Sequence, residues 1–523
     1  MTTKLTKSAG LIGAATMSSR VLGMVRDVVQ AHYFATGIAA DAFVVATRIP
    51  TLLRDLFAEG AMSAAFVPTF TRYLEKGGKP AAWRLGSLVI NALLVVTGLL
   101  VVLGILLAGP ITEFYTTANY QAIPGKLALT VQLTRINMPF LLLIAVAAAY
   151  MGMLNALRRF FVPAMSPTMY NVVFILCTVV FVPVFTTMGI QPVMALSMGM
   201  LLGGVAQIVS QWPAIRAEGY RHQWILAPKD PGLREVLLLM GPGSLGVAAA
   251  QINILVNTLL ATQIEGAPSA LSYAFRLMYM PVGIFGVSIA TAAIPELARQ
   301  AAHNAHGEMG TTLSWGMRLM LVISVPATIG LMVLSTPIIE LIYKGGEFSG
   351  DSVYLVSQSL LYYAPGIVGY SLVKILSPSF YSMRDARTPV TVSVITIATN
   401  LVLNLALVNV LGFQGLALGT AIAANVNALL LFVLLSRRIG GLETAAILGV
   451  FSRILLASAA MAVAAYATEA QLHAFFPAEH FGARLIRVMG GITAGMLVLA
   501  IAAWVLRIEE FRQAVARITK RFR

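Results

Sequence analysis

Residues 11–67 read LIGAATMSSRVLGMVRDVVQAHYFATGIAADAFVVATRIPTLLRDLFAEGAMSAAFV. The segment is apolar enough to cross a membrane twice, because one crossing needs about 20 predominantly apolar residues. An ionised side chain at the bilayer centre costs roughly 2.5–3.5 kcal/mol, so charged groups in such a segment are expected to face protein or water. The arginines of the segment therefore predict a chamber that handles an anion. The charged positions are Arg20, Arg26, Asp27, Asp41, Arg48, Arg54, Asp55 and Glu59.

The composition of the whole chain indicates a polytopic membrane protein. Its 523 residues are 58% hydrophobic and 11% charged, whereas a soluble domain is about half apolar and a quarter charged. The net charge of +15 lies in short loops and at the C-terminus, so membrane topology explains it better than nucleic-acid binding. Because Arg20 interrupts the first apolar stretch, we interpret this stretch as an uncleaved first span rather than a signal peptide.

The pattern of apolar segments predicts an all-α polytopic membrane protein with fourteen transmembrane helices. Lys and Arg collect in alternate loops, which predicts that both termini are cytoplasmic. The expected spans are residues 8–33, 38–70, 84–109, 128–154, 162–186, 190–214, 236–262, 268–297, 314–337, 353–378, 388–409, 413–436, 446–467 and 485–507.

Residues that recur at a spacing of 226 predict an internal repeat. Pro139 and Pro365 are separated by this distance, and so are Arg158 and Arg384. We expect two pseudo-symmetric six-helix lobes related by an axis along the membrane normal, because an even number of spans gives both lobes the same orientation. The expected divisions are an N-lobe at residues 1–225, a C-lobe at 226–440, and two C-terminal helices with a basic cytoplasmic tail at 441–523.

Two acid–base pairs share a spacing of seven residues. Arg20 and Asp27 form the first pair, and Arg48 and Asp55 form the second. Residues seven apart lie on one stripe of a helix, so each pair could be an internal ion pair. Glu59 follows Asp55 by four residues and is expected to be a further partner or a gate.

Three other arginines are not explained by pairing along a stripe. Arg26 and Arg54 lie about 120° around the helix from those stripes, and Arg276 has no acid within one helical turn. A guanidinium group keeps its charge and donates paired hydrogen bonds, which suits a phosphate group. We therefore predict that Arg20, Arg26, Arg54 and Arg276 bind an anionic ligand.

Four polar residues of later spans are further candidates to line the chamber. Gln251, Asn253 and Asn257 share the seventh span and could equally bond between helices. Lys374 lies late in the tenth span, where extension of its side chain to the membrane interface is the alternative.

The residues give no support to catalysis or to metal binding. His303 and His306 are three apart, but they lie in a loop without a cluster of carboxylate ligands. The sequence lacks a P-loop, a nucleophile elbow and an HExxH pattern. We predict a transporter with no catalytic residue, no metal and no cofactor, and the sequence leaves Na⁺, H⁺ and Cl⁻ open as coupling ions.

Several stretches resemble the MurJ (MviN) lipid II flippases. They are SRVLGMVRD at residues 19–27, DAF at 41–43, LLRDLFAEGA at 52–61, YAFRLMYMP at 273–281 and PSFYSMRDARTPV at 378–390. The resemblance covers nearly the whole chain and agrees with the fourteen-span layout. It implies a member of the multidrug/oligosaccharidyl-lipid/polysaccharide exporter superfamily, with two lobes around a cationic cavity that opens alternately to each side.

The resemblance also implies roles for individual residues. The cargo would be lipid II, the undecaprenyl-diphosphate-linked disaccharide-pentapeptide of peptidoglycan synthesis, and the last two helices would form a groove for its prenyl tail. The arginines that match the family's cavity positions are Arg20, Arg26, Arg54 and Arg276. The resemblance implies a gating role for the acidic residues Asp41 and Glu59. Residue spacing adds Asp27, Arg48 and Asp55 to the residues expected to act in gating or charge pairing.

We therefore expect a flippase that carries lipid II from the inner to the outer leaflet of the bacterial cytoplasmic membrane. Its partners would be lipid II, membrane lipids and peptidoglycan synthases, without nucleic acid. Two alternatives remain open. A flippase for another prenyl-diphosphate-linked sugar would share the arginines, whereas an ion-coupled multidrug exporter should favour buried acids.

Overall fold

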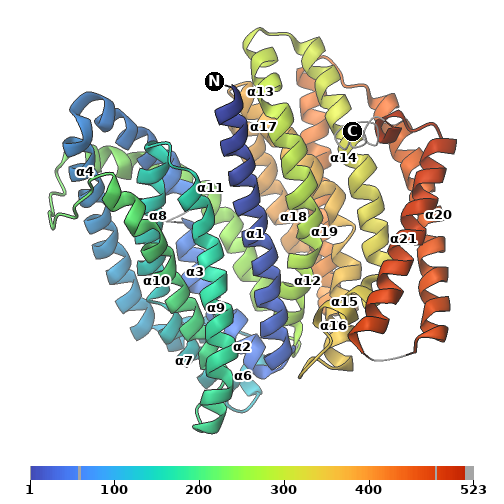
Figure 1. Ribbon diagram of the computed structural model, residues 1–523, viewed down its shortest axis with the longest axis horizontal. Coiled ribbons are helices and arrows are strands. Elements are labelled where there is room, and N and C mark those ends of the chain that lie inside the picture. Colours follow the sequence, from blue (N-terminus) through green and yellow to red (C-terminus); the bar gives the residue numbers. More distant parts are fainter. Residues whose placement is uncertain (1, 57–59, 478–479, 513–523) are drawn as a thin grey trace. The chain divides into compact units, whose positions relative to one another are not determined.

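The computed structural model describes residues 2–56, 60–477 and 480–512, and these residues form long helices joined by short connections (Figure 1). The helices up to residue 261 are α1 (Thr2–Phe34), α2 (Ile38–Ala46), α3 (Arg48–Arg54), α4 (Gly60–Leu106), α5 (Ala108–Phe114), α6 (Ala118–Ala122), α7 (Lys126–Asn137), α8 (Phe140–Ala156), α9 (Phe161–Thr187), α10 (Met194–Ala217) and α11 (Pro231–Ala261). Those that follow are α12 (Ala267–Pro281), the π-helix η2 (Val282–Gly286), α13 (Val287–Ala302), α14 (His306–Val333), α15 (Ser335–Tyr343), α16 (Gly350–Tyr363), α17 (Gly366–Ser382), α18 (Arg387–Leu411), α19 (Phe413–Arg438), α20 (Thr444–Phe475) and α21 (Phe481–Val505).

The predicted all-α polytopic membrane fold is confirmed. Within the described residues, ten helices are long and apolar enough to cross a membrane, and the bent pair α16 and α17 makes an eleventh if it is one span. The expected spans at 8–33, 38–70 and 236–262 are not among these eleven. The total of fourteen therefore stays a prediction.

The second expected span is not one continuous helix, and Pro50 explains the break. Proline has no N–H to donate to the carbonyl four residues earlier, so the helix that contains Ala46 stops and α3 begins at Arg48. The Thr47 hydroxyl donates to the Val44 carbonyl at 3.0 Å, which occupies one of the carbonyl groups at the end of α2. The orientation of the α3 arginines is thereby uncoupled from that of α2.

A second break lies inside α4, where the sequence predicts a basic loop between two spans. Gly78 has φ +66° and ψ −172°, a conformation that glycine adopts at little steric cost. The chain is helical on both sides of this residue. The segment that joins the second and third expected spans is therefore two helical ends meeting at Gly78.

The chain forms two compact units. Unit 1 comprises Met1–Ser269 and Gly346–Phe348, and unit 2 comprises Ala270–Gly345 and Ser349–Arg523. In unit 1, α9 packs against α1 and α10, while α4 packs against α8 and α11. In unit 2, α14 packs against α17 and α20, and α20 pairs with α21. The lobe boundaries inferred from the repeat, at residues 225 and 440, stay predictions.

The predicted repeat is visible in the local structure of α8 and α17. Both helices have 17 residues and directly follow a proline, Pro139 or Pro365. Both are followed by an arginine in the left-handed region, with φ +61° at Arg158 and +58° at Arg384. The amide of the next residue donates to a carbonyl five residues back in each case, at 2.8 and 2.9 Å. Identical helix ends at a spacing of 226 residues support pseudo-symmetric lobes.

Candidate functional site

Arg26 lies at the contact between α1 and α9 in unit 1. Its Nε and Nη2 donate to Asp27 Oδ1 at 3.4 and 3.2 Å, and its Nη1 donates to Asn171 Oδ1 at 3.1 Å. The guanidinium carbon is 5.8 Å from the ring centre of Tyr170 and 5.4 Å from that of Phe174. Such aromatic contacts favour a cation. The side chain is thus held in one place while 17% of it stays exposed.

Arg20 does not form the ion pair with Asp27 that its spacing allows. Asp27 pairs instead with the adjacent Arg26. Arg20 is half-buried and makes no hydrogen bond or ion pair with the described part of the chain. It precedes Arg26 by less than two helical turns on α1. A cation without an acid partner in the described chain therefore lies near Arg26, whose charge is paired with Asp27.

Arg54 ends α3 and pairs with the next residue. Its Nε and Nη2 donate to Asp55 Oδ1 at 2.8 and 2.6 Å. The other carboxylate oxygen of Asp55 accepts a 2.8 Å hydrogen bond from Gln251 Nε2 of α11. Gln251 therefore bonds between helices, and Asp55 contacts Arg54 rather than Arg48. Arg48 is the half-buried first residue of α3.

Asp41 occupies a separate, fully buried site in unit 1. Its Oδ2 accepts from Lys126 Nζ at 2.9 Å and from the Gly266 amide at 2.8 Å. Its Oδ1 accepts from the amide and the hydroxyl of Ser269 at 3.1 and 2.7 Å. Gly266 and Ser269 belong to the turn before α12 and to its beginning, so Asp41 caps that helix from another part of the chain.

Sequence reasoning missed Lys126 and Asn171 as partners of charged site residues. Lys126 follows a glycine at the beginning of a span, a position typical of an exposed loop. In the structure it is 0% exposed, and its ammonium lies 4.6 Å from the ring centre of Tyr120. Asn171 had a usable signal, because an amide inside the apolar stretch 161–185 needs a hydrogen-bond partner.

In unit 2, Arg276 is exposed on α12. One turn further along this helix, the Tyr279 ring stacks on Phe275 with centres 5.8 Å apart. The Lys374 ammonium lies 5.8 Å from the centre of the Tyr279 ring, and Tyr370 packs edge-on against the same ring. The predicted residue Lys374 therefore lies in an aromatic cluster.

The remaining candidates are two asparagines, one glutamate and the loop histidines. Asn253 and Asn257 are half-buried on α11, and Glu59 lies outside the described residues. His303 Nδ1 is 2.8 Å from the Arg299 carbonyl. Within the described chain, His, Cys, Asp and Glu side chains form no group of three or more that could hold a metal ion.

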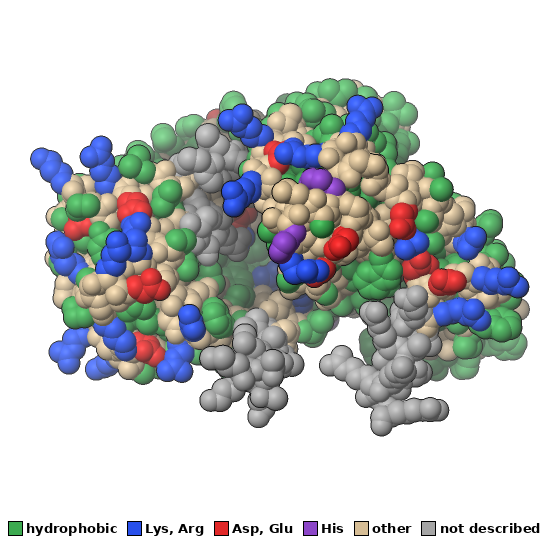
Figure 2. Space-filling view, turned by 90° about the horizontal axis from the view of Figure 1, so that it is seen from above, with side chains coloured by type: hydrophobic (Ala, Val, Ile, Leu, Met, Phe, Trp, Pro, Cys, Tyr) green, Lys and Arg blue, Asp and Glu red, His purple; other side chains and the backbone are tan. Residues whose placement is uncertain are grey.

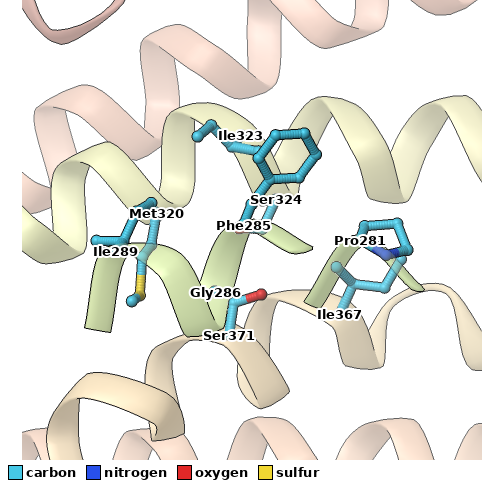
Figure 3. A pocket seen from close by; sticks show the side chains of 9 residues that line it. All are labelled: Pro281, Phe285, Gly286, Ile289, Met320, Ile323, Ser324, Ile367 and Ser371. Carbon is cyan, nitrogen blue, oxygen red and sulfur yellow. The ribbon is translucent and has the colours of Figure 1, made fainter. Parts of the chain in front are cut away.

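A small apolar pocket of unit 2 lies beside the π-helix and is distinct from the charged residues (Figure 3). Its empty volume is about 230 Å³, and α12, η2, α13, α14 and α17 contribute its walls. Ser324 and Ser371 are the hydroxyl-bearing residues among those labelled in Figure 3. Without a cationic side chain in its lining, this pocket does not match the predicted anion chamber.

Charged side chains also gather on the face seen in Figure 2, where Lys and Arg are interspersed with Asp and Glu. Many loop cations of unit 1 are paired. Glu218 accepts from Lys79 at 3.0 Å and from Arg159 at 2.9 Å, and these hydrogen bonds hold the pKa of the Glu218 carboxyl below its usual range. In unit 2, Arg438 pairs with Asp385. Loop pairs of this kind differ from Arg20, which has no acid partner in the described chain.

The comparisons with known proteins identify the family. A family model described as "Lipid II flippase MurJ" matches residues 30–486. A probable lipid II flippase MurJ of Vibrio cholerae is 36% identical over 439 residues, which are 82% of this chain and 82% of the relative. One of Rhizobium meliloti is 33% identical over 498 residues, which are 94% of this chain and 92% of the relative. A lipid II flippase MurJ of Burkholderia cenocepacia is 32% identical over 82% of this chain and 83% of its own length.

Solved structures agree with this result. A structure titled "Lipid II flippase MurJ, inward closed conformation" is 26% identical, with a TM-score of 0.76, and the match covers 95% of this chain and 99% of that chain. An inward-facing multidrug resistance MATE family transporter is 15% identical, with a TM-score of 0.64 over 83% of this chain and 98% of that chain, which shows a shared fold alone. The chain therefore belongs to the lipid II flippase MurJ family and is a multi-pass protein of the inner membrane.

Proposed function

We propose that the protein is a lipid II flippase. It carries the lipid-linked peptidoglycan precursor from the inner to the outer leaflet of the cytoplasmic membrane by alternating access, and it is a transporter rather than an enzyme. The observation that carries this proposal is the family match over residues 30–486, which includes the arginine-bearing helix α3 and the end of α1. Peptidoglycan synthases, which consume the exported precursor, are the proposed partners.

Arg20, Arg26, Arg54 and Arg276 bind the diphosphate of the cargo. The guanidinium groups of Arg20, Arg26, Arg48 and Arg54 on α1 and α3 outnumber the carboxylates of Asp27 and the adjacent Asp55 by two, apart from Lys4 and Lys7 near the beginning of α1. Two negative charges on a diphosphate diester would balance that excess. A guanidinium has five N–H donors, so an arginine that already contacts a carboxylate can also donate to a phosphate oxygen.

The acidic residues and Arg48 control the charge balance of the empty and loaded states. Asp27 and Asp55, which accept hydrogen bonds from Arg26 and Arg54, hold these arginines in place when the cargo is absent in this proposal. Asp41 acts as a gate by holding the beginning of α12, the helix that carries Arg276. Glu59 completes this set, and Gln251, Asn253, Asn257 and Lys374 contribute polar groups to the path.

Both termini face the cytoplasm in this proposal, so the membrane potential favours export. Each elementary charge that crosses 100 mV contributes about 2.3 kcal/mol, so two negative charges moving outward gain about 4.6 kcal/mol. Nucleotide hydrolysis is then unnecessary. The C-terminal helices at residues 441–523 provide a surface for the prenyl tail.

The experiment compares Arg54→Ala, Arg54→Lys and Arg84→Ala in cells depleted of their own flippase. Lipid II that reaches the outer leaflet is measured with an externally added probe, alongside the amount of inserted protein. Arg54→Ala should abolish export, and Arg54→Lys should restore part of it, because an ammonium cannot make paired hydrogen bonds.

Arg84 is the matched control, because it is 55% exposed and pairs with Asp230 away from the proposed site. Its replacement should leave export unchanged. Wild-type export by inserted Arg54→Ala would remove Arg54 from the binding site. Failure of the wild-type protein to restore lipid II export would overturn the proposed function itself.

A further inference from the structure

We propose that Phe275, Tyr279, Tyr370 and Lys374 form a headgroup subsite that stacks on a sugar ring and pairs with a carboxylate of the peptide attached to it. This inference rests on the proposed function and adds to it, because the arginines explain only binding of the diphosphate. All four residues belong to unit 2, on α12 and α17.

Lys374 lies in the middle of a membrane helix, where a cation without an acid partner needs an explanation. It lies eight residues from each end of α17 (Gly366–Ser382), about 12 Å from either end. It is half-buried, and no carboxylate of the described chain pairs with it. An ammonium at this depth in a membrane helix is costly when it faces lipid, so it is expected to face water or an anionic group.

The direction of the side chain argues against extension to the membrane interface. The Lys374 ammonium lies 5.8 Å from the centre of the Tyr279 ring. That ring also contacts Tyr370, one turn earlier on α17, at 5.6 Å. The Lys374 side chain is therefore directed at an aromatic ring of α12.

The three aromatic rings form a surface that is only partly covered by protein. Phe275 and Tyr279 are stacked at an interplanar angle of 18°, and Tyr370 lies edge-on to both. Each of the three is half-buried rather than buried. The hydroxyl groups of Tyr279 and Tyr370 have no hydrogen-bond partner within the described residues. Hydroxyl groups beside aromatic faces suit a sugar, which offers C–H groups to the ring and O–H groups to the phenol.

The position of Arg276 sets the order of the groups along the ligand. Arg276 and Tyr279 are three residues apart on α12, so their side chains are neighbours on the helix surface. A sugar bonded directly to a diphosphate would therefore reach Tyr279 when the diphosphate is at Arg276. Lys374, beside Tyr279, would then meet the substituent of that sugar, which in lipid II is a peptide ending in a carboxylate.

The experiment measures binding of three probes to the purified full chain: lipid II, the same lipid with an uncharged amide in place of its peptide, and undecaprenyl diphosphate without sugar. Lys374→Gln should weaken binding of lipid II about tenfold and leave the two other probes unchanged, because the lost contact is a charge-assisted hydrogen bond. Tyr279→Leu should weaken both sugar-bearing probes about fivefold and spare undecaprenyl diphosphate.

Conservative variants keep the test independent of folding. Lys374→Arg and Tyr279→Phe retain the charge and the ring, and both should bind lipid II within about twofold of the wild type. Tyr354→Leu, at a tyrosine of α16 that is 56% exposed, is the matched control. Equal weakening of all three probes by Lys374→Gln, or no weakening of any, would overturn the subsite. Weak binding of lipid II by the wild-type protein would instead count against the proposed function.

Discussion

Lys126 donates a 2.9 Å hydrogen bond to Asp41, and neither side chain has any exposed surface. The carboxylate also accepts from Gly266 and Ser269, so it is saturated with donors. A buried ion pair is not strongly stabilising by itself, but removal of one partner leaves an uncompensated buried charge. The pair therefore connects α2, α7 and the beginning of α12. Replacement of either Lys126 or Asp41 alone is expected to destabilise the fold.

Lys126→Met should destabilise the protein by roughly 3–5 kcal/mol, because Asp41 is left as a buried charge without its cation. The thermal unfolding midpoint in detergent checks this expectation. Lys126→Met combined with Asp41→Asn should recover much of the loss. Lys79→Met, at an exposed loop pair with Glu218, should change the midpoint little. Equal midpoints for Lys126→Met and the wild type would refute the argument.

Asn171→Leu should reduce lipid II export about tenfold while the protein still inserts. The amide accepts from Arg26 Nη1 at 3.1 Å and donates to the Ser19 carbonyl at 3.1 Å. Its loss lets Arg26 move, and a hydrogen bond to a charged group is worth about 1.5–3 kcal/mol. Asn425→Leu is the control, because Asn425 donates to the Pro365 carbonyl in unit 2. Similar export by both variants would count against a positioning role for Asn171.

Gly369→Ala should prevent close packing of α17 on α19. A Cβ atom at Gly369 would lie 2.5 Å from the carbonyl carbon and oxygen of Ala424, which are backbone atoms and cannot move aside. Gly449→Ala meets no atom within 4 Å and should be neutral or stabilising by up to about 1 kcal/mol, because alanine favours a helix. Thermal unfolding compares the two variants. A Gly369→Ala midpoint equal to that of Gly449→Ala would show that the helices separate easily.

Stability should fall in weak acid partly because of His222. Burial lowers the pKa of this imidazole, and its Nδ1 is 2.9 Å from the Tyr220 hydroxyl. A histidine whose pKa is lower in the folded state binds fewer protons than in the unfolded state. Its contribution is therefore present above about pH 6.5 and is lost as pH falls through the lower, folded pKa.

His222→Gln should flatten the decline in the unfolding midpoint just below pH 6.5. His306, an exposed histidine at the beginning of α14, supplies the control His306→Gln. If the pH profile of His222→Gln matches the wild-type profile, the imidazole does not contribute to the acid sensitivity.

The sequence predicts the helical architecture well, because apolar length determines most spans directly. The 226-residue spacing also relates Arg158 to Arg384, which share a left-handed conformation, while the division into two lobes stays a prediction. The break between α2 and α3 follows from Pro50. Local chemistry thus accounts for each of these features.

The partners of the charged residues were less predictable. The spacing of Arg20 and Asp27 allows a pair on one stripe, yet Asp27 contacts Arg26, which Asn171 holds from α9. Asp41 finds Lys126, which is 85 residues away in the chain. Contacts between helices depend on packing and on side-chain direction, and one sequence specifies neither explicitly.

The π-helix η2 has a consequence for the azimuth of Arg276. A π-turn accommodates one extra residue, and each residue of an α-helix advances the chain by about 100°. The wide turn at Val282–Gly286 absorbs the extra residue, so α12 keeps nearly the azimuth relative to α13 that a regular α-helix one residue shorter would give it. If the same residues were all α-helical, α12 would be rotated by about 100°, so the direction in which Arg276 projects from unit 2 is held by the π-helix, about two turns away from the arginine itself.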